Sequence, residues 1–355
     1  MTELIHGGDI YGHEKELLDF SANLSPLGLP ESVRAALSSS IGSFAQYPDP
    51  LCRELTAALS KAEKVPPAWI LCGNGAADLI FRTVQAVKPR RAVVTAPAFA
   101  EYERALRAAG CEVVFHPLSE KADFCLDETL LDTIGSSVDL LFLCNPNNPT
   151  GQTVERGLLL RILQRCRECG TRLLLDECFV PFLDDPEAFT LTGALGEFPN
   201  LLILKAFTKL YAMAGLRLGY LLCSDETLNE SAAACGQPWN VSVPAQVAGV
   251  AALADTQYVK RTRALVKSER ERMRARLGEL GLTVIGSRAN YLFFRYDGPA
   301  DLRERLLEWD ILIRSCENFQ GLDRRYCRAA VKLPGQNDRL LEALKMILQR
   351  EAAHG

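Results

Sequence analysis

Short, almost continuously apolar runs alternate with amphipathic helical segments through the middle of this chain, and no other feature constrains its fold as strongly. An apolar run of roughly four to eight residues without polar alternation is typical of a strand that is buried on both faces. Helical segments between such strands cover the two faces of a parallel sheet. The predicted strands are RAVVTA (91–96), CEVVFHP (111–117), DLLFLCNP (139–146), RLLLDE (172–177), LLILKAF (201–207) and LGYLLC (218–223). The pattern therefore predicts an α/β fold with a mostly parallel sheet.

The pattern changes after Pro244. A long, highly charged helical stretch, interrupted near Asp255, leads towards a second and smaller α/β unit. That unit contains predicted strands at 290–296, 311–316 and 326–333, and predicted helices at 300–310 and 337–350. We therefore expect three parts: an N-terminal segment (1–40) that joins the small domain and the active site, a large domain (41–250) and a small C-terminal domain (251–355).

Charge and hydropathy exclude two classes of partner. The chain has 40 Lys and Arg against 44 Asp and Glu, and this net charge of −4 gives no electrostatic reason to expect nucleic-acid binding. No apolar run is long enough to span a membrane, and the N-terminus lacks the apolar segment of a signal peptide. We therefore expect a cytoplasmic protein without nucleic-acid or membrane partners.

The twelve cysteines lie scattered through the chain, several of them within apolar runs, where a cysteine acts as a small hydrophobic residue. Cys166 and Cys169 form a CxxC pair at the end of a predicted helix, but no second pair of cysteines or histidines accompanies them. A zinc site needs such a second pair, so we expect no metal. Scattered cysteines also fit the reducing cytoplasm.

Two stretches rich in glycine, proline and asparagine fall where predicted strands end, which is where α/β sheets gather their ligands. In CGNGAAD (72–78), glycines precede a helix N-terminus, so the stretch is either an anion-binding turn or simply a tight turn. NPNNPTG (145–151) is a rigid turn after a buried strand, and its rigidity would hold Asn148 as a hydrogen-bond donor.

Two further stretches place charges beside buried strands. Asp176 and Glu177 end an apolar strand, where a carboxylate is costly to bury unless it has a partner; one of them could be a helix N-cap instead. KAFTKLYAMAGLRLGY (205–220) contains two lysines and an arginine. On that segment alone, either lysine could be a solvated surface charge.

One ligand would satisfy all four stretches. A phosphate suits the glycine-rich turn and Arg217, a basic ring nitrogen suits Asp176, and a ring oxygen suits Asn148. An aldehyde suits Lys209, whose amine can form a Schiff base. Pyridoxal 5′-phosphate carries each of these groups, so the sequence predicts this cofactor.

The ordered set GNGAAD, NPNNPTG, DECF, TK and GLRLGY resembles the fold-type I pyridoxal-phosphate enzymes, in the branch that contains histidinol-phosphate aminotransferase. The resemblance covers essentially the whole chain. It implies a large domain with a mostly parallel sheet, a smaller α/β domain and a homodimer. It also implies that Lys209 forms the Schiff base and that Lys205 is a bystander with an ordinary charge.

The resemblance assigns further residues to the cofactor. Asp176 would pair with the pyridinium nitrogen, Asn148 would bond the ring hydroxyl oxygen, and Phe99 would stack on the ring. Tyr47, which could also be plain packing before Pro48, would reach the cofactor phosphate of the neighbouring subunit. The subunit's own cofactor phosphate would be held by Gly75, Ala76, Ala77, Thr208 and Arg217, the two alanines through backbone N–H groups only.

Within the branch, the chain looks most like the decarboxylases that act on L-threonine O-3-phosphate in the cobalamin pathway. That similarity rests on HGGDI (6–10), LDFSANLSPLGLP (18–30), FAEYERAL (99–106), PWNVSVPAQ (238–246) and ILIRSCENFQGLD (311–323). It implies that Arg328 binds the substrate carboxylate and that Arg314, His6 and Asn23 surround the substrate phosphate, with Asn290 lining the pocket. His6 could equally lie away from the ligand, and Arg314 could pair with Glu317 or Asp323 on the surface.

Two departures from the aminotransferase pattern favour decarboxylation. Phe179 and Phe99 stand where the aminotransferases usually have tyrosine, so one hydrogen bond to the ring oxygen is lost while stacking survives. The Cα bond held perpendicular to the cofactor ring is the one that breaks, so the pocket decides the reaction. The alternatives are transfer of an amino group between histidinol phosphate and 2-oxoglutarate, and a non-catalytic module that binds pyridoxal phosphate.

Overall fold

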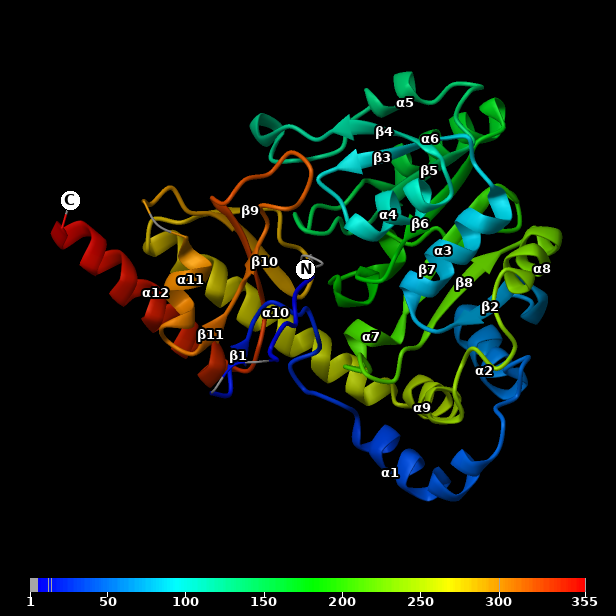
Figure 1. Ribbon diagram of the computed structural model, residues 1–355, viewed down its shortest axis with the longest axis horizontal. Coiled ribbons are helices and arrows are strands. Elements are labelled where there is room, and N and C mark those ends of the chain that lie inside the picture. The colour runs from blue at the N-terminus through cyan, green and yellow to red at the C-terminus, as the bar shows by residue number, and fades with distance from the viewer. Residues whose placement is uncertain (1–5, 12, 14, 300, 355) are drawn as a thin grey trace.

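The computed structural model describes residues 6–11, 13, 15–299 and 301–354 (Figure 1). Residues 1–5, 12 and 14 of the predicted N-terminal segment, and residues 300 and 355 of the predicted small domain, lie outside the described residues. The boundaries of the three predicted parts stay a prediction. In the described part of the chain, no helix combines the length and the apolar character needed to cross a membrane.

A seven-stranded sheet forms the centre of the larger part, in the order β2-β8-β7-β6-β5-β3-β4. Its strands are β2 (Ile70–Gly73), β3 (Arg91–Ala96), β4 (Glu112–Pro117), β5 (Leu140–Cys144), β6 (Arg172–Asp176), β7 (Leu201–Ala206) and β8 (Gly219–Cys223). Strands β4, β3, β5, β6 and β7 pair in parallel, whereas β8 runs antiparallel to both of its neighbours. The predicted α/β fold with a mostly parallel sheet is confirmed.

Helices cover both faces of this sheet, as the apolar strands require (Figure 1). Along β5, Leu141 and Leu143 belong to one core, while Leu140 and Phe142 belong to the other. The first core is closed by α2 (Arg53–Glu63), α6 (Arg156–Cys169) and α9 (Val243–Ala254). The second is closed by α3 (Ala76–Val87), α4 (Ala100–Ala108) and α8 (Glu226–Ala234).

The smaller part is an antiparallel sheet of order β12-β13-β10-β9, packed on helices. Its strands are β9 (Thr283–Ile285), β10 (Tyr291–Arg295), β12 (Arg314–Ser315) and β13 (Tyr326–Ala330), and its helices are α11 (Leu302–Leu307) and α12 (Pro334–His354). Helix α10 (Thr256–Glu279) joins the two parts, because Val266 packs in the first core and Met273 in the core of the smaller part. The predicted interruption at Asp255 separates α9 from α10.

The single strand predicted at 311–316 is wrong. The segment divides at Ile313 into β11 (Ile311–Leu312) and β12, because the two halves have different partners. Strand β11 pairs in parallel with β1 (Leu18–Asp19) from the N-terminal segment, whereas β12 pairs with β13. The N-terminal segment is thereby bound to the smaller part of the molecule.

The remaining helical elements are short or peripheral. They are α1 (Glu31–Ser40), α5 (Leu130–Thr133) and α7 (Phe207–Leu210), with 3-10 turns at Ile41–Ala45 (η1), Pro67–Trp69 (η2), Glu120–Ala122 (η3), Val180–Phe182 (η4), Pro186–Ala188 (η5) and Thr192–Ala194 (η6). Because β5, β6 and β7 are parallel, the segments that follow them meet at one edge of the sheet. Asn148, Asp176 and Lys209 lie in or just before these segments.

Candidate active site

A cavity of about 420 Å³, called here the inner cavity, opens at this edge between the large sheet and the smaller part. Most of the predicted site residues line it: His6, Asn23, Ala76, Ala77, Phe99, Asn148, Asp176, Thr208, Lys209, Arg217, Arg314 and Arg328. They are spread along the chain from His6 to Arg328, so the tertiary fold brings them together. The functional roles of these residues are not tested by their positions and stay predictions.

Three predicted residues do not line the inner cavity. Asn290 is fully buried and donates through Nδ2 to the Asn23 carbonyl at 3.1 Å, so it supports the wall from behind instead of lining the pocket as expected. Tyr47 lies on the surface, 79% exposed. Gly75 lies just outside the cavity, beside Arg217.

Lys209 lies half-buried in the short helix α7, directly after β7. Burial lowers the pKa of its amine to about 8, and the neighbouring cations Arg328 and Arg217 contribute to the same shift. Its ammonium nitrogen is 6.0 Å from the centre of the Phe179 ring. The lowered pKa increases the fraction of neutral amine near neutral pH, and the neutral amine is the form that attacks an aldehyde.

Asp176 is buried at the end of β6, and its two carboxylate oxygens are held separately. Oδ1 accepts the backbone N–H of Cys178 at 2.9 Å, and Oδ2 accepts the hydroxyl of Tyr102 at 2.6 Å. Tyr102 is fully buried, and burial together with the Asp176 charge raises its pKa well above the usual value. The hydroxyl therefore stays a donor and fixes the carboxylate towards the cavity.

The N-terminus of α3 and Arg217 form an anion-binding corner. Helix α3 begins without a side-chain cap, so the N–H groups of Ala76 and Ala77 are directed into the cavity wall. Gly75 has φ +84°, and a Cβ there would lie 2.6 Å from Arg217 Nη2. Glycine is therefore required for the guanidinium to reach the helix N-terminus, and Thr208 adds a hydroxyl in the same cavity.

Arg328 presents a buried positive charge on β13. Its guanidinium donates to the Ser21 carbonyl at 2.9 Å and to Asn148 Oδ1. With the Asn23 amide turned so that its oxygen faces the arginine, Asn23 accepts two further bonds at 3.2 Å. Among the described residues no carboxylate lies within 4.0 Å of this guanidinium. A buried cation with neutral partners alone is suited to binding an anion.

Asn148 was expected to act mainly as a donor to the cofactor ring. In this structure its Oδ1 accepts from Arg328, and this bond orients the amide so that the NH₂ group points away from the arginine. Phe179 packs edge-on against Tyr291, with ring centroids 5.1 Å apart. The expected donor role of Asn148 is compatible with this arrangement and stays a prediction.

Arg314 and Arg328 are direct cross-strand partners on β12 and β13. Burial and the Arg328 charge lower the pKa of Arg314 to about 10. Arg314 donates to Asn318 Oδ1 at 2.7 Å, and its guanidinium lies 5.4 Å from the Phe319 ring. Like charges at directly opposite positions destabilise a sheet, so the pair favours a bound anion between or beside them.

His6 lies in the cavity wall beside the ring of Phe99, at 5.7 Å between ring centroids. Its Nε2 lies 2.7 Å from Glu101 Oε1. The hydrogen bond from His6 holds the pKa of Glu101 below its usual value, against the opposing effect of burial. The structure thus places His6 at the predicted site, and its role there stays a prediction.

Lys205 is not the ordinary solvated charge that the sequence suggested. Its side chain is 13% exposed and contacts Glu63 at 2.6 Å and Glu177 at 3.8 Å. Glu177 is completely buried, where it also accepts the Thr190 hydroxyl at 2.7 Å and the Leu191 N–H at 2.8 Å. The correction arises because successive strand residues face opposite sides of the sheet, so Glu177 and Lys205 point into the core opposite to Asp176.

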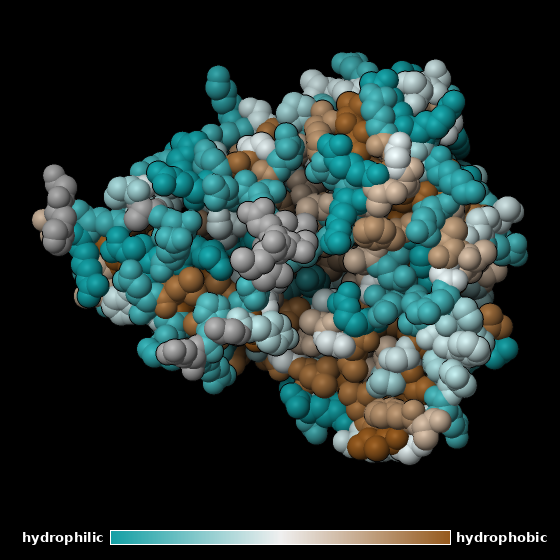
Figure 2. Space-filling view, viewed as in Figure 1, coloured by the Kyte–Doolittle hydropathy of each residue, from teal (hydrophilic) through white to brown (hydrophobic). Residues whose placement is uncertain are grey.

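Tyr47 stacks on Trp239, with ring centroids 4.6 Å apart. Figure 2 shows apolar side chains gathered on the lower part of the molecule, where Figure 1 places α1 and α9. The large exposed hydrophobic residues of this region are Ile41, Phe44, Tyr47, Leu51 and Trp239, with exposures of 42% to 79%. Exposed apolar patches of this kind are typical of contact surfaces between proteins.

Sequence reasoning missed several residues of the site, and three of them hold other site residues by hydrogen bonds: Tyr102, Glu101 and Ser21. Two of them could have been found, because Glu101 and Tyr102 stand two and three positions after Phe99 at the start of a predicted helix. An i, i+3 spacing places Tyr102 on the same helix face as Phe99. The role of Ser21 rests on its backbone carbonyl, for which a sequence carries no signal.

Comparison with known sequences identifies a protein family and individual proteins that resemble this chain. The chain matches the family Aminotransferase class I and II over residues 15–344. It is 43% identical to the threonine-phosphate decarboxylase of Salmonella typhimurium over 335 residues, which cover 94% of this chain and 92% of that relative. It is 32% identical to histidinol-phosphate aminotransferase 1 of Cupriavidus pinatubonensis over 343 residues, which cover 95% and 89% of the two chains.

Solved structures show that both activities share this fold. Histidinol-phosphate aminotransferase from Clostridium acetobutylicum matches with a TM-score of 0.89 at 31% identity, covering 94% of this chain and 100% of that one. L-threonine-O-3-phosphate decarboxylase from Porphyromonas gingivalis gives 0.82 at 28%, covering 93% and 99%. The Sinorhizobium meliloti aminotransferase in complex with pyridoxal-5′-phosphate gives 0.84 at 26%, covering 93% and 90%. The predicted fold-type I architecture is confirmed, but a shared fold does not choose between the two reactions.

Proposed function

Because this chain belongs to the class I and II aminotransferase family, we propose that it is a pyridoxal 5′-phosphate-dependent decarboxylase of L-threonine O-3-phosphate. The products are (R)-1-amino-2-propanol O-2-phosphate and carbon dioxide, and the reaction belongs to cobalamin biosynthesis. The higher identity to a decarboxylase, 43% against 32% for the aminotransferase, supports this choice.

Pyridoxal 5′-phosphate is the cofactor, and the groups around the inner cavity fit it. The α3 N-terminus, Arg217 and Thr208 match a phosphate, and the cavity would be too narrow there for any residue but Gly75. Asp176 would hold a protonated ring nitrogen, and Lys209 would bind the aldehyde carbon covalently. When bound, this cofactor supplies the electron sink that allows a bond at the substrate Cα to break.

Lys209 would move the proton in this reaction. Its amine loses a proton near pH 8, so it can both accept and return one at physiological pH. In the decarboxylation, the bond between Cα and the carboxylate carbon breaks and carbon dioxide leaves. A proton from Lys209 then takes the place of the carboxylate on Cα.

The observation that carries this proposal is the pair of opposed guanidiniums, Arg314 and Arg328, in one cavity with Lys209. A substrate with a carboxylate and a phosphate on one short chain would satisfy both. Arg328 would hold the carboxylate, while Arg314, His6 and Asn23 would surround the phosphate. Fixing both ends of the substrate sets which Cα bond stands perpendicular to the cofactor ring.

Amino-group transfer between histidinol phosphate and 2-oxoglutarate is the second candidate. The aminotransferase structure with a TM-score of 0.89 supports it, because the backbone could host either reaction. Histidinol phosphate has no carboxylate, however, so it would leave Arg328 buried without an anion during half of the reaction. A non-catalytic role has no specific observation in its favour.

One experiment separates the candidates. Purified protein loaded with cofactor is incubated with O-phospho-L-threonine, and separately with histidinol phosphate and 2-oxoglutarate, while carbon dioxide and glutamate are measured. The decarboxylase proposal expects carbon dioxide from the first mixture and no glutamate from the second. Glutamate without carbon dioxide would establish the aminotransferase instead, and neither product would favour a binding role.

We further propose that two copies form a homodimer through the exposed apolar patch around Tyr47 and Trp239. Tyr47 would then reach the cofactor phosphate of the neighbouring subunit, as the family resemblance implies. Sedimentation equilibrium should give twice the chain mass of 39.1 kDa, and Tyr47→Ala should weaken cofactor retention. The twelve free cysteines support a cytoplasmic location.

A further inference from the structure

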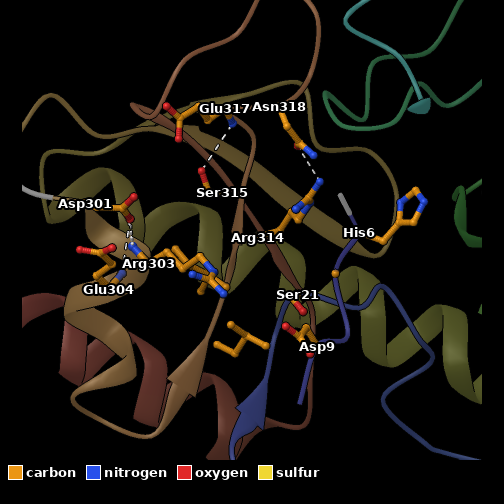
Figure 3. A pocket seen from close by; sticks show the side chains of 13 residues that line it. His6, Asp9, Ser21, Asp301, Arg303, Glu304, Arg314, Ser315, Glu317 and Asn318 are labelled. Carbon is orange, nitrogen blue, oxygen red and sulfur yellow. Dashed lines mark hydrogen bonds between the residues drawn. The ribbon is translucent and has the colours of Figure 1, made fainter. Parts of the chain in front are cut away.

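A second cavity of about 360 Å³, the outer cavity, adjoins the inner one (Figure 3). Its far side is formed by α11 and the β12 region, including Asp301, Arg303 and Asn318. Four residues line both cavities: His6, Gly7, Ser21 and Arg314. We call His6–Gly8 the partition segment, because His6 and Gly7 lie between the two cavities together with Ser21 and Arg314.

The partition segment lies tightly against Ser21. The Gly8 N–H donates to Ser21 Oγ at 2.7 Å. A Cβ on Gly7 would lie 2.4 Å from the Ser21 carbonyl oxygen, so no larger residue could take this path. Ser21 itself is fixed by its hydroxyl bond to Asp19 at 2.6 Å. This end of the partition segment is thus attached to the smaller part of the molecule through β1.

The other end is attached to the larger part by Glu101. Glu101 is 5% exposed on α4, and an ionised carboxylate accepts only, so His6 donates from Nε2 to Oε1 at 2.7 Å. Arg104 provides a second, weaker partner at 3.3 Å. This bond holds the His6 ring, and His6 lines both cavities.

We infer that Glu101 is a positioning residue that sets the size of substrate the enzyme accepts. By holding His6, it keeps the partition segment between the two cavities, so the inner cavity receives a compact phosphorylated amino acid and excludes longer phosphorylated amines. This inference rests on the proposed function, because it concerns the substrate of the same site. The merged space of both cavities would admit a longer chain.

The test measures the dissociation constants of two ligands of different length for the holoenzyme. Stopped-flow absorbance of the bound cofactor gives these constants for O-phospho-L-threonine and for L-histidinol phosphate, before turnover interferes. In Glu101→Ala the constant for phosphothreonine should rise about tenfold, as expected when a charge-assisted hydrogen bond is lost. The constant for histidinol phosphate should stay unchanged or fall. Glu101→Gln, which keeps a neutral acceptor, should show a smaller change of the same sign.

Glu103→Gln is the matched control, because Glu103 lies on the same helix and pairs with Arg107 at 2.6 Å, away from both cavities. It should leave both constants unchanged. An equal change in both constants for the Glu101 variants, or no change in either, would overturn the inference. Circular dichroism and cofactor content show whether Glu101→Ala folds; if it does not, Glu101→Gln alone decides. Failure of the proposed function would appear separately, as absence of carbon dioxide from the unmodified enzyme.

Discussion

Lys205 and Lys209 lie four positions apart at the end of β7 and in α7, yet their surroundings act on their charges in opposite ways. For Lys205, burial opposes the charge, but Glu63 and Glu177 outweigh it and raise the pKa. For Lys209, burial is reinforced by Arg328 and Arg217, and the pKa falls to about 8. One lysine is thus kept as a cation within a buried network, and the other loses its proton more readily than a solvated lysine does.

The opposite pKa shifts of the two lysines show that burial alone does not lower the pKa of a lysine. Both amines lie within protein, and the sign of the neighbouring charges decides the outcome. On the Lys205 side the neighbours are carboxylates, with Tyr220 completing the network through its bond to Glu63. On the Lys209 side the neighbours are the cations Arg328 and Arg217. The same contrast separates a structural ion network from a site of chemistry.

The largest effect is expected from the removal of Lys209, which tests whether this lysine and not Lys205 forms the covalent link to the cofactor. Lys209→Ala should lower kcat by at least about a thousandfold, because no other amine replaces the covalent link and the proton carrier. Borohydride treatment of the holoenzyme followed by mass spectrometry should then find no trapped cofactor. The matched variant Lys205→Ala, provided that it folds, should still give the borohydride-trapped cofactor adduct. Trapping lost in Lys205→Ala but kept in Lys209→Ala would reverse the two assignments.

Lys205→Met tests the structural side of the comparison. It leaves the buried Glu177 and the half-buried Glu63 without their cation, so the free energy of unfolding should fall by about 3 kcal/mol. Because the pKa of Lys205 is raised in the folded state, its stabilising contribution is fully present at neutral pH and is lost only above the usual lysine value of 10.5.

Urea denaturation at pH 7 measures this loss, with the exposed Lys61→Met as control. A second change, Glu177→Gln in the Lys205→Met background, should recover part of the stability because it removes the orphaned charge. An unfolding free energy unchanged by Lys205→Met would show that the network contributes nothing.

Tyr102→Phe tests how the surroundings of Asp176 affect cofactor binding. It removes the hydroxyl bond to Asp176 while the stacking on Phe142 survives, so cofactor affinity should fall by about tenfold. Equilibrium dialysis of the cofactor measures this change, and the melting temperature in the apo form should move little. A loss of apo stability without a loss of cofactor affinity would make Tyr102 a packing residue instead.

The smallest expected effect is a shift in pH dependence. Cofactor uptake by the apo-protein needs neutral Lys209, so its rate should rise with pH through about 8 and then level off. Arg328→Met removes a neighbouring cation that lowers this pKa, so the midpoint should move to higher pH. Arg303→Met, whose guanidinium lines the outer cavity, should leave the midpoint unchanged. If Arg328→Met also leaves the midpoint unchanged, the charge of Arg328 does not contribute to the lowered pKa of Lys209.

Local sequence patterns predicted the fold well because the burial of each strand shows in the apolar character of its own residues. The apolar runs at 91–96 and 201–207 became β3 and β7 almost without change, and parallel strand ends then had to meet at one edge. The segment 311–316 was misjudged because its partners, β1 and β13, lie far away in the chain. Pairing with two different neighbours divided it, and no property of the six residues indicates this.

The local sequence determined which groups are available: the apolar strands, the glycine-rich turn at 72–78, and the motifs that place Asp176, Lys209 and Arg217 beside the ends of particular strands. Only the tertiary structure decided their states. Lys205 meets Glu63, which is 142 residues away, Glu101 meets His6 across 95 residues, and Arg328 meets the Ser21 carbonyl across 307. Burial and neighbouring charge set the pKa and orientation of a side chain, and both are properties of three-dimensional surroundings that local sequence does not contain.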